Sequence, residues 1–234
     1  MEVNTQAIIR LAWARTLGLA DDALLEPATT RITREDDSIV MFVALWEHRI
    51  LIAPPWLLEV APALDSRDLA SGSALLALSA EHGGRLLGEG TLAFTDGYVE
   101  HPRLKSVLVA DEPEAVTDLE RACPPDDVAE VGLSLMSAHF VTLDDQGGAV
   151  AAAGYAESQG ILGNVGILVP PELRRNGHGT LAAAIATNDA LDAGLVPQWR
   201  ARRGHRASLG LSRRLGYREI GSQTTVLLGA ERSG

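Results

Sequence analysis

The spacing of apolar residues in the first hundred positions predicts a small lobe of helices and strands. Some stretches repeat apolar residues at helical spacing, and others are short apolar runs rich in β-branched residues, as strands are. We expect helices over residues 1–20 and 70–81 and strands over residues 39–46, 50–53 and 90–94. Gly18 is placed to stop the first helix, and the polar turn Glu47-His48-Arg49 to join the first two strands. This lobe contains no recognisable catalytic constellation.

A second lobe is expected to begin where the pattern changes near residue 105. The polar, proline-bearing stretch of residues 100–105 interrupts the apolar pattern, as linkers between domains do. We therefore expect an N-terminal α+β lobe over residues 1–105 and a second domain over residues 106–234. The second domain should contain a strand, two helices, an antiparallel meander of strands, a long helix, a strand, a short helix and a final strand. The expected strands are residues 107–110, 140–143, 149–157, 161–169, 195–201 and 222–228. The first two helices begin near Pro113 and Pro125, the long helix ends near Gly194, and the short helix lies within residues 205–217.

Composition places the chain among globular proteins. Of its 234 residues 46% are hydrophobic, and the mean hydropathy is +0.07, so the chain can bury a sizeable core. A single cysteine, Cys123, excludes an internal disulfide and is compatible with a reducing compartment. The sequence has no charged-then-apolar leader and no apolar run of membrane-spanning length. We therefore expect a cytoplasmic protein without a membrane partner.

Charge is distributed unevenly along the chain. The formal net charge is −11, yet residues 170–234 carry ten arginines against five acidic residues. Residues 1–169 carry ten basic and 26 acidic residues. Most of the C-terminal arginines, taken singly, are expected to form a solvated face, but as a cluster they would compensate several anionic oxygens of a phosphorylated ligand. A pI near 5.0 and the lack of a basic, aromatic groove argue against nucleic acid as a partner.

The most informative segment is a glycine-punctuated turn within residues 169–180. It follows an apolar run and precedes an alanine-rich helix, so free N–H groups and the positive end of a helix dipole are expected there. Gly177 and Gly179 lack Cβ atoms and let the backbone approach an anion closely. Arg174 and Arg175 add positive charge at the same place. The turn therefore predicts a site for a pyrophosphate.

The spacing of the glycines argues against two common phosphate loops. No Lys follows Gly179, as a Walker-type loop requires, and Ala182 stands where a dinucleotide fingerprint has its third glycine. The pattern Arg174-x-x-Gly177-x-Gly179 instead matches the signature [QR]-x-x-G-x-[GA]. In this respect the segment resembles the GNAT superfamily of acyl-CoA-dependent N-acetyltransferases.

A second motif downstream supports the resemblance. The run from His205 to Tyr217 is similar to the closing helix and turn of that family, N-x-x-[AS]-x-x-L-Y-x-x-x-G-[FY]. The matching residues are Ser208, Leu211, Gly216 and Tyr217. The resemblance covers about the last 130 residues. It implies an α/β (α+β) GNAT fold with a mixed, centrally antiparallel sheet and a splayed strand pair, and leaves open that the smaller α+β lobe is a degenerate GNAT-like half.

The resemblance also implies acetyl-CoA as a co-substrate. In the family the pantetheine arm inserts between the strand before the turn and the following strand, here residues 166–169 and 195–201, and pairs with exposed main-chain groups. Pro197 would suit the open part of that ladder, because it has no N–H to leave unpaired. The residues expected to bind the coenzyme are Ile167, Leu168, Val169, Arg174, Arg175, Asn176, Gly177, His178, Gly179, Thr180, His205 and Ser208.

Catalytic residues are less well marked than the coenzyme site. Amine acetylation needs a proton route and stabilisation of an oxyanion, and the candidate bases are Glu157 and Glu130, with His139 behind them. Ser212 stands where many family members place a Tyr that protonates the departing thiolate, so either solvent or another group must serve. The tyrosines that could substitute are Tyr155, Tyr217 and Tyr98, of which Tyr155 is the catalytic candidate. No spacing of His, Cys and carboxylates indicates a metal site.

Three functions are compatible with these features. The leading one is an N-acetyltransferase that moves an acetyl group from acetyl-CoA to a primary amine of a small molecule or peptide by direct attack in a ternary complex. The second is a catalytically weak acyl-CoA-binding regulatory protein, which the missing Tyr favours. The third is a scaffold whose basic end binds another anion, such as a nucleotide. The expected partners are acetyl-CoA and an amine acceptor, and a homodimer is left open.

Overall fold

The computed structural model describes residues 1–27, 29–33, 38–60, 69–110 and 112–229 of the chain. By their packing these residues form two compact units that interleave along the sequence. Unit 1 comprises Met1–Asp22, Phe94–Trp199 and Ala207–Arg218, and unit 2 comprises Ala23–Ala93, Arg200–Arg206 and Glu219–Gly234. The domain boundary at residue 105 stays a prediction.

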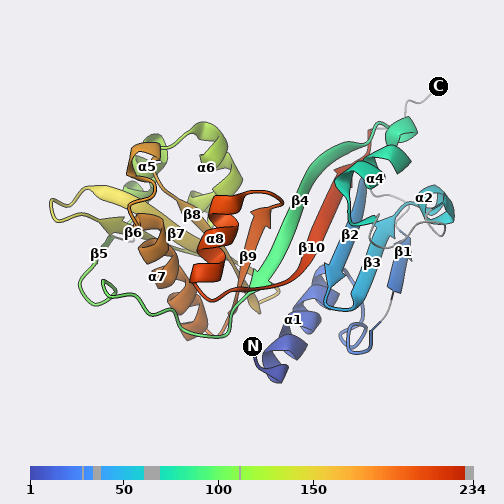
Figure 1. The fold of residues 1–234 in the computed structure, drawn as a ribbon, viewed down its shortest axis with the longest axis horizontal. Coiled ribbons are helices and arrows are strands. Elements are labelled where there is room, and N and C mark those ends of the chain that lie inside the picture. Colours follow the sequence, from blue (N-terminus) through green and yellow to red (C-terminus); the bar gives the residue numbers. More distant parts are fainter. Residues whose placement is uncertain (28, 34–37, 61–68, 111, 230–234) are drawn as a thin grey trace. The chain divides into compact units, whose positions relative to one another are not determined.

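The sheet of unit 1 is mixed, with antiparallel strands at its centre (Figure 1). Its strands lie in the order β9-β8-β7-β6-β5, and every neighbouring pair is antiparallel except β8 and β9, which are parallel. The strands are β5 (Leu108–Ala110), β6 (Ala138–Leu143), β7 (Ala149–Ser158), β8 (Leu162–Leu168) and β9 (Val196–Arg202). This arrangement confirms the mixed, centrally antiparallel sheet that the sequence predicts.

Helices pack on both faces of this sheet. Leu168 of β8 packs in a buried cluster with Leu119 of α5, whereas the side chain of the preceding residue, Ile167, lies beside Gly179 of α7. Neighbouring residues of a strand point to opposite faces, so α5 and α7 lie on opposite faces of the sheet. The helices are α5 (Pro113–Arg121), α6 (Pro125–Val131), α7 (His178–Asp192) and α8 (Arg206–Arg214), with the single turns η3 (Leu133–Leu135) and η4 (Pro171–Leu173).

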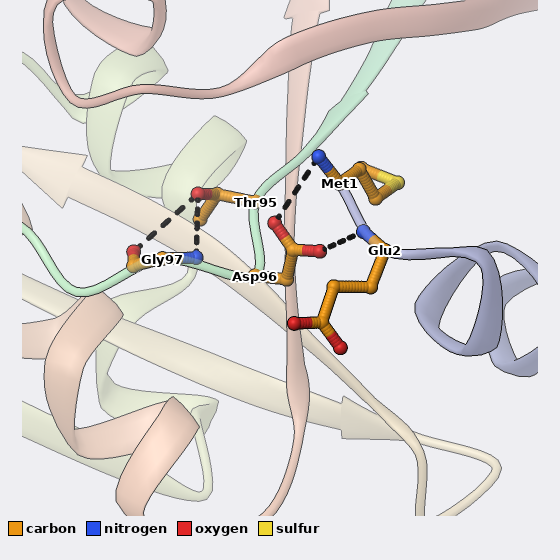
Figure 2. A network of polar contacts seen from close by, with 5 residues as sticks. All are labelled: Met1, Glu2, Thr95, Asp96 and Gly97. Carbon is orange, nitrogen blue, oxygen red and sulfur yellow. Dashed lines mark hydrogen bonds and ion pairs between the residues drawn. The ribbon is translucent and has the colours of Figure 1, made fainter.

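The first helix, α1 (Val3–Thr16), also belongs to unit 1. Figure 2 shows how its start is held, because Asp96 accepts the N–H of Glu2 at 2.6 Å and lies 3.6 Å from the Met1 ammonium group. Its other end is fixed by the indole of Trp13, which donates to the buried amide oxygen of Gln198 at 3.1 Å. Gly18 follows the helix with a φ of 69°, which confirms it as the helix stop.

The sheet of unit 2 has the strand order β1-β3-β2-β10-β4. β1 and β3 are parallel, while β3, β2 and β10 pair antiparallel. The strands of this sheet are β1 (Thr29–Thr33), β2 (Ile39–Leu45), β3 (His48–Ala53), β4 (Arg85–Phe94) and β10 (Arg218–Leu227). The helices of unit 2 are α2 (Pro55–Val60), α4 (Gly72–Leu78) and the short η2 (Ala80–His82). A buried cluster that includes Phe42, Leu57, Leu75 and Val226 joins the helices to this sheet.

The expected turn Glu47-His48-Arg49 is wrong in its length. Leu45 pairs directly with His48, so the loop consists of two residues and His48 already belongs to β3. Trp46 takes the positive φ of 47° that so tight a hairpin requires. Because glycine or asparagine normally marks this position, the sequence carries no usual signal for the turn.

Within the described residues no helix has the length and apolar character to span a bilayer.

Candidate functional site

The parallel strands β8 and β9 separate partway along their length. Their register runs from Leu162 opposite Val196 to Val165 opposite Trp199, and no pair continues beyond that point among the described residues. On its other side β8 remains paired with β7 as far as Leu168. The opening therefore lies between β8 and β9, and it confirms the splayed strand pair expected from the sequence.

The main-chain groups that face this opening can be identified from the hydrogen-bond direction. Val196 of β9 donates its N–H to the carbonyl of Ile161 at 2.8 Å, so the main-chain groups of Ile161 point towards β9. Main-chain direction alternates along a strand, which turns the groups of Ile167 and Val169 to the same side. No described residue of β9 pairs with them there, so both stand where an inserted chain could take their hydrogen bonds.

The backbone after β8 is bent by two left-handed residues. Arg175 has a φ of 67° and Gly177, the N-cap of α7, a φ of 87°. Glycine adopts a positive φ without strain, whereas the same conformation at Arg175 strains the backbone because arginine has a Cβ atom. A Cβ atom at Gly179 would lie 3.1 Å from Cγ2 of Val169, so the absence of a side chain lets α7 begin directly against the end of β8.

This bend leaves a row of main-chain donors. The first α7 amides to find a helical partner are those of Thr180 and Leu181, which both donate to the carbonyl of Gly177. Within the described part of the chain, the N–H groups of Asn176, Gly177, His178 and Gly179 donate to no protein group. They lie at the N-terminus of a helix of 15 residues, where its dipole is positive. Such donors are suited to bind an anion.

Arg174 supports the turn through two contacts. Its Nε donates to the carbonyl of Val169 at 3.0 Å, and an Nη atom lies 2.6 Å from Oδ2 of Asp127 in α6. Both side chains of this ion pair remain partly accessible, at 44% and 40%. The first contact uses the carbonyl of Val169. Among the described residues, the N–H and carbonyl of Ile167 and the N–H of Val169 have no main-chain partner on the side of β9.

The expectation for Pro197 is wrong. Pro197 stands opposite Gly163, within the paired part of β8 and β9 rather than in the opening. Its main chain faces away from β8, since its carbonyl accepts the N–H of Thr95 at 3.3 Å. The missing N–H therefore lies on the side of Thr95, the residue after the end of β4, and not on the side of the opening.

The other residues predicted to bind the coenzyme differ in what they offer. Leu168 has a buried side chain, and its main chain points to β7. The N–H of Thr180 is used inside the helix, and the hydroxyl of Ser208 accepts the indole N–H of Trp199 at 3.0 Å. His205 is exposed and belongs to unit 2, so its contact with the coenzyme stays a prediction. Asn176 is exposed and His178 half-buried at the turn itself.

Two of the predicted catalytic residues lie together at the other end of α7. Tyr155 is buried, and its hydroxyl donates to Oδ2 of Asp189 at 2.8 Å. Burial, together with the hydrogen bond and charge of Asp189, raises its pKa to about 12. Glu157, two residues on, is exposed and points to the same face. Asp189 lies eleven residues after His178, roughly 16 Å along the helix, so the structure does not bring this pair to the turn.

The remaining predicted base, Glu130, lies on the opposite face of the sheet. It is exposed on α6, next to Val131, whose Cγ1 lies 3.1 Å from where a Cβ of Gly166 would be. Gly166 is the first residue of β8 beyond its pairing with β9. Glu130 therefore lies on a helix that packs beside Gly166 at the opening, and His139 stands opposite Gly154 on β7, which is itself opposite Gly166.

Neither Ser212 nor Tyr217 offers a free proton donor. Ser212 is fully buried and donates to the carbonyl of Leu209 at 3.0 Å. The hydroxyl of Tyr217 is buried against that of Thr187 at 2.8 Å, and burial raises its pKa. Tyr98 is exposed and donates to Asp192 at 2.6 Å. Each of these hydroxyls is thus already engaged within the protein.

Asp127 and Asp189 are residues that sequence reasoning missed. Asp127 is the partner of Arg174, 47 positions away, and Asp189 is the partner of Tyr155, 34 positions away. A single sequence holds no signal for such pairs, because acidic residues are common in this chain and only the packing of α6 and α7 selects these two. Among the described residues no group of three or more His, Cys, Asp or Glu is placed to hold a metal ion.

Comparison with known proteins gives similarity to solved structures alone. No protein-family model and no curated protein matches the sequence. Similar structures include a GCN5-related N-acetyltransferase from Kribbella flavida (TM-score 0.48, 20% identity, 68% of this chain and 65% of that one). Another is an acetyltransferase from the GNAT family from Colwellia psychrerythraea (0.49, 13%, 66% and 61%). A third is a GCN5-related N-acetyltransferase-like protein from Streptococcus suis (0.48, 16%, 84% and 87%). The chain thus spans less than two thirds of the length of the first two.

Proposed function

We propose that this protein is an acyltransferase of the GNAT type, which transfers an acetyl group from acetyl-CoA to a primary amine of a small molecule or peptide. The observation that carries the proposal is the opening between β8 and β9 beside the free amides of residues 176–179. An elongated ligand with an anionic end fits both features at once. The glycine-spaced turn motif and the closing motif of α8 support the same ligand.

The two parts of coenzyme A match the two parts of the site. The pyrophosphate would accept hydrogen bonds from the amides of Gly177, His178 and Gly179 at the positive end of α7. The pantetheine arm carries two amide groups and would pair with the open main chain of Ile167 and Val169, as an added strand does. The thioester would then lie near Gly166, where β8 and β9 come together.

Acetyl transfer in such a site depends mainly on positioning the two substrates. Direct attack by the amine requires no protein nucleophile, but it requires that a proton leave the amine. Of the three catalytic candidates, Glu130 is the one whose helix packs beside Gly166, and we propose it as the base. Glu157 and Tyr155 remain candidates from the sequence: they lie far from the turn along α7, although Tyr155 stands opposite Val165, the residue before Gly166. A cytoplasmic location and a homodimer also remain predictions.

The alternative function is a catalytically weak acyl-CoA-binding regulatory protein. The observation that favours it is that the hydroxyls of Ser212, Tyr217 and Tyr155 are all engaged within the protein. None of them is free to protonate the departing thiolate. Solvent or another group would have to do so in the enzyme, whereas a binding protein needs no acid.

A thiol-release assay with acetyl-CoA across amines, amino acids, aminoglycoside-like compounds and peptides tests the proposal. Turnover with one acceptor class supports the enzyme, and Glu130→Gln should then lower kcat by about tenfold or more while Glu157→Gln changes it little. Acetyl-CoA binding by calorimetry without thiol release supports the regulatory protein. A thermal shift with ATP and none with acetyl-CoA would replace both with a nucleotide site.

A further inference from the structure

Met136 occupies a slot that two glycines create on the sheet of unit 1. Its Sδ lies 3.0 Å from where a Cβ of Gly154 would be, and its Cε would collide with a Cβ of Gly166. The two glycines stand opposite one another on β7 and β8 and so share a face. Any side chain at Gly166 would displace the end of the methionine.

This slot lies at the point where β8 and β9 separate. Gly166 directly follows Val165, the last residue of β8 that pairs with β9. A pantetheine arm that pairs with β8 from Val169 backwards would therefore end beside Gly166. Its acyl group would meet the side chain of Met136 on the face that carries α6.

The surroundings of Met136 fix the base of its side chain and leave its tip adaptable. Its N–H donates to the carbonyl of Leu133 at 3.1 Å, and the N–H of the next residue, Ser137, donates to the carbonyl of Tyr155 at 3.0 Å. Met136 is half-buried, and Val131 of α6 stands beside it over Gly166. An unbranched thioether in such a place fills space without a fixed shape.

We propose that Met136 determines the acyl-chain specificity of the site by closing it beyond an acetyl group. This inference rests on the proposed function. Truncation to alanine removes Cγ, Sδ and Cε and leaves room for a longer, apolar acyl chain. Leucine retains the volume and should retain the preference for acetyl.

The test compares acetyl-CoA with butyryl-CoA by thiol release, and by calorimetric binding without acceptor. In Met136→Ala the ratio of kcat/KM, or of affinity, for butyryl over acetyl should rise about tenfold or more, as expected when apolar space for methylene groups is added. Met136→Val should give a smaller rise and Met136→Leu none. Met41→Ala, a methionine truncation on β2 in unit 2, is the matched control and should leave the ratio unchanged.

The outcomes distinguish a failure of the inference about Met136 from a failure of the proposed function. If the wild-type protein releases thiol or binds acetyl-CoA, and neither Met136→Ala nor Met136→Val changes the ratio, Met136 is a packing residue only and the inference is overturned. If the wild-type protein neither binds nor turns over any acyl-CoA, the proposed function fails and the inference fails with it. A shift that appears equally in Met41→Ala would also overturn the inference.

Discussion

Arg174 donates to Asp127 across 47 residues of sequence, with an Nη atom 2.6 Å from Oδ2. The pair joins the first residue of the turn motif to α6. It also means that the charge of Arg174 is already balanced before any ligand arrives. If a pyrophosphate binds at the turn, it must do so near the carboxylate of Asp127.

Asp127→Asn should therefore strengthen the binding of acetyl-CoA. The asparagine can still accept a hydrogen bond from Arg174, but it removes a negative charge close to the proposed phosphate site. We expect the Kd to fall about two- to fivefold at low salt, and the effect to shrink as salt rises. Because the pair is half-exposed, the free energy of unfolding should change by less than about 1 kcal/mol. Calorimetry and urea unfolding measure the two effects.

The matched control for this change is Asp118→Asn. Asp118 forms an ion pair of the same 2.6 Å length with Arg121 on α5, and both side chains are well exposed. Its loss should leave the Kd unchanged. Weaker binding in Asp127→Asn would show instead that the carboxylate is needed to hold the turn in place.

Gly177→Ala should raise the KM for acetyl-CoA. Gly177 has a φ of 87°, so an added Cβ strains the backbone; it would meet no protein atom within 4 Å and would project into the space where the phosphate is proposed to bind. Gly147, in the hairpin between β6 and β7, has a φ of 83° and equally open surroundings. Each alanine should cost about 1 kcal/mol of stability. Only Gly177→Ala should change the KM for acetyl-CoA. An equal change of KM in both variants would show that the turn is not part of the acetyl-CoA site.

The sequence predicts this turn well because its residues are contiguous. The positions of Arg174, Gly177 and Gly179 follow from local backbone requirements, and so does the helix that begins after them. The partner of Arg174 does not, because Asp127 reaches it only through the packing of α6. The same holds for Met136, whose role depends on two glycines that come together only when β7 pairs with β8. The sequence places Pro197 in the opening, whereas it lies in the paired part of β9, because a sequence does not show where two strands begin to separate.

The stability of the protein should fall between pH 10 and pH 12 through Tyr155. Its pKa is raised from 10.0 to about 12 by burial and by Asp189, so the folded state favours the neutral phenol. That contribution to stability is complete below pH 10 and is lost as the pH rises through about 12. Tyr155→Phe should show a shallower loss over this range in urea unfolding. An unchanged slope would mean that the phenol titrates normally.

Tyr217→Phe should lower stability without affecting catalysis. The change leaves the buried hydroxyl of Thr187 without its partner, which lies 2.8 Å away in the native protein. Leaving a buried polar group unpaired costs about 1–3 kcal/mol. The free energy of unfolding should fall by that amount, while kcat in the thiol-release assay stays within about twofold of wild type. A large loss of kcat would make Tyr217 the missing acid.

Each of two single substitutions in the turn should weaken acetyl-CoA binding. Arg174→Ala removes the positive charge and releases the carbonyl of Val169. Gly177→Glu introduces a negative charge where the pyrophosphate is proposed to bind. Both should raise the KM for acetyl-CoA by about tenfold or more, the first because the turn loses its contacts with Val169 and Asp127, and the second because a carboxylate repels the phosphates. Wild-type behaviour of both variants in the thiol-release assay would show that the phosphates bind elsewhere.

The central claim is that acetyl-CoA binds along the opened edge of β8 and at the start of α7. Amide hydrogen exchange with and without acetyl-CoA tests it most directly, because the proposed contacts are made by main-chain N–H groups. Exchange should slow in peptides that cover residues 166–180 and stay unchanged in the hairpin of residues 143–149. Unchanged exchange over residues 166–180 at saturating acetyl-CoA, or equal protection by ATP, would contradict the account.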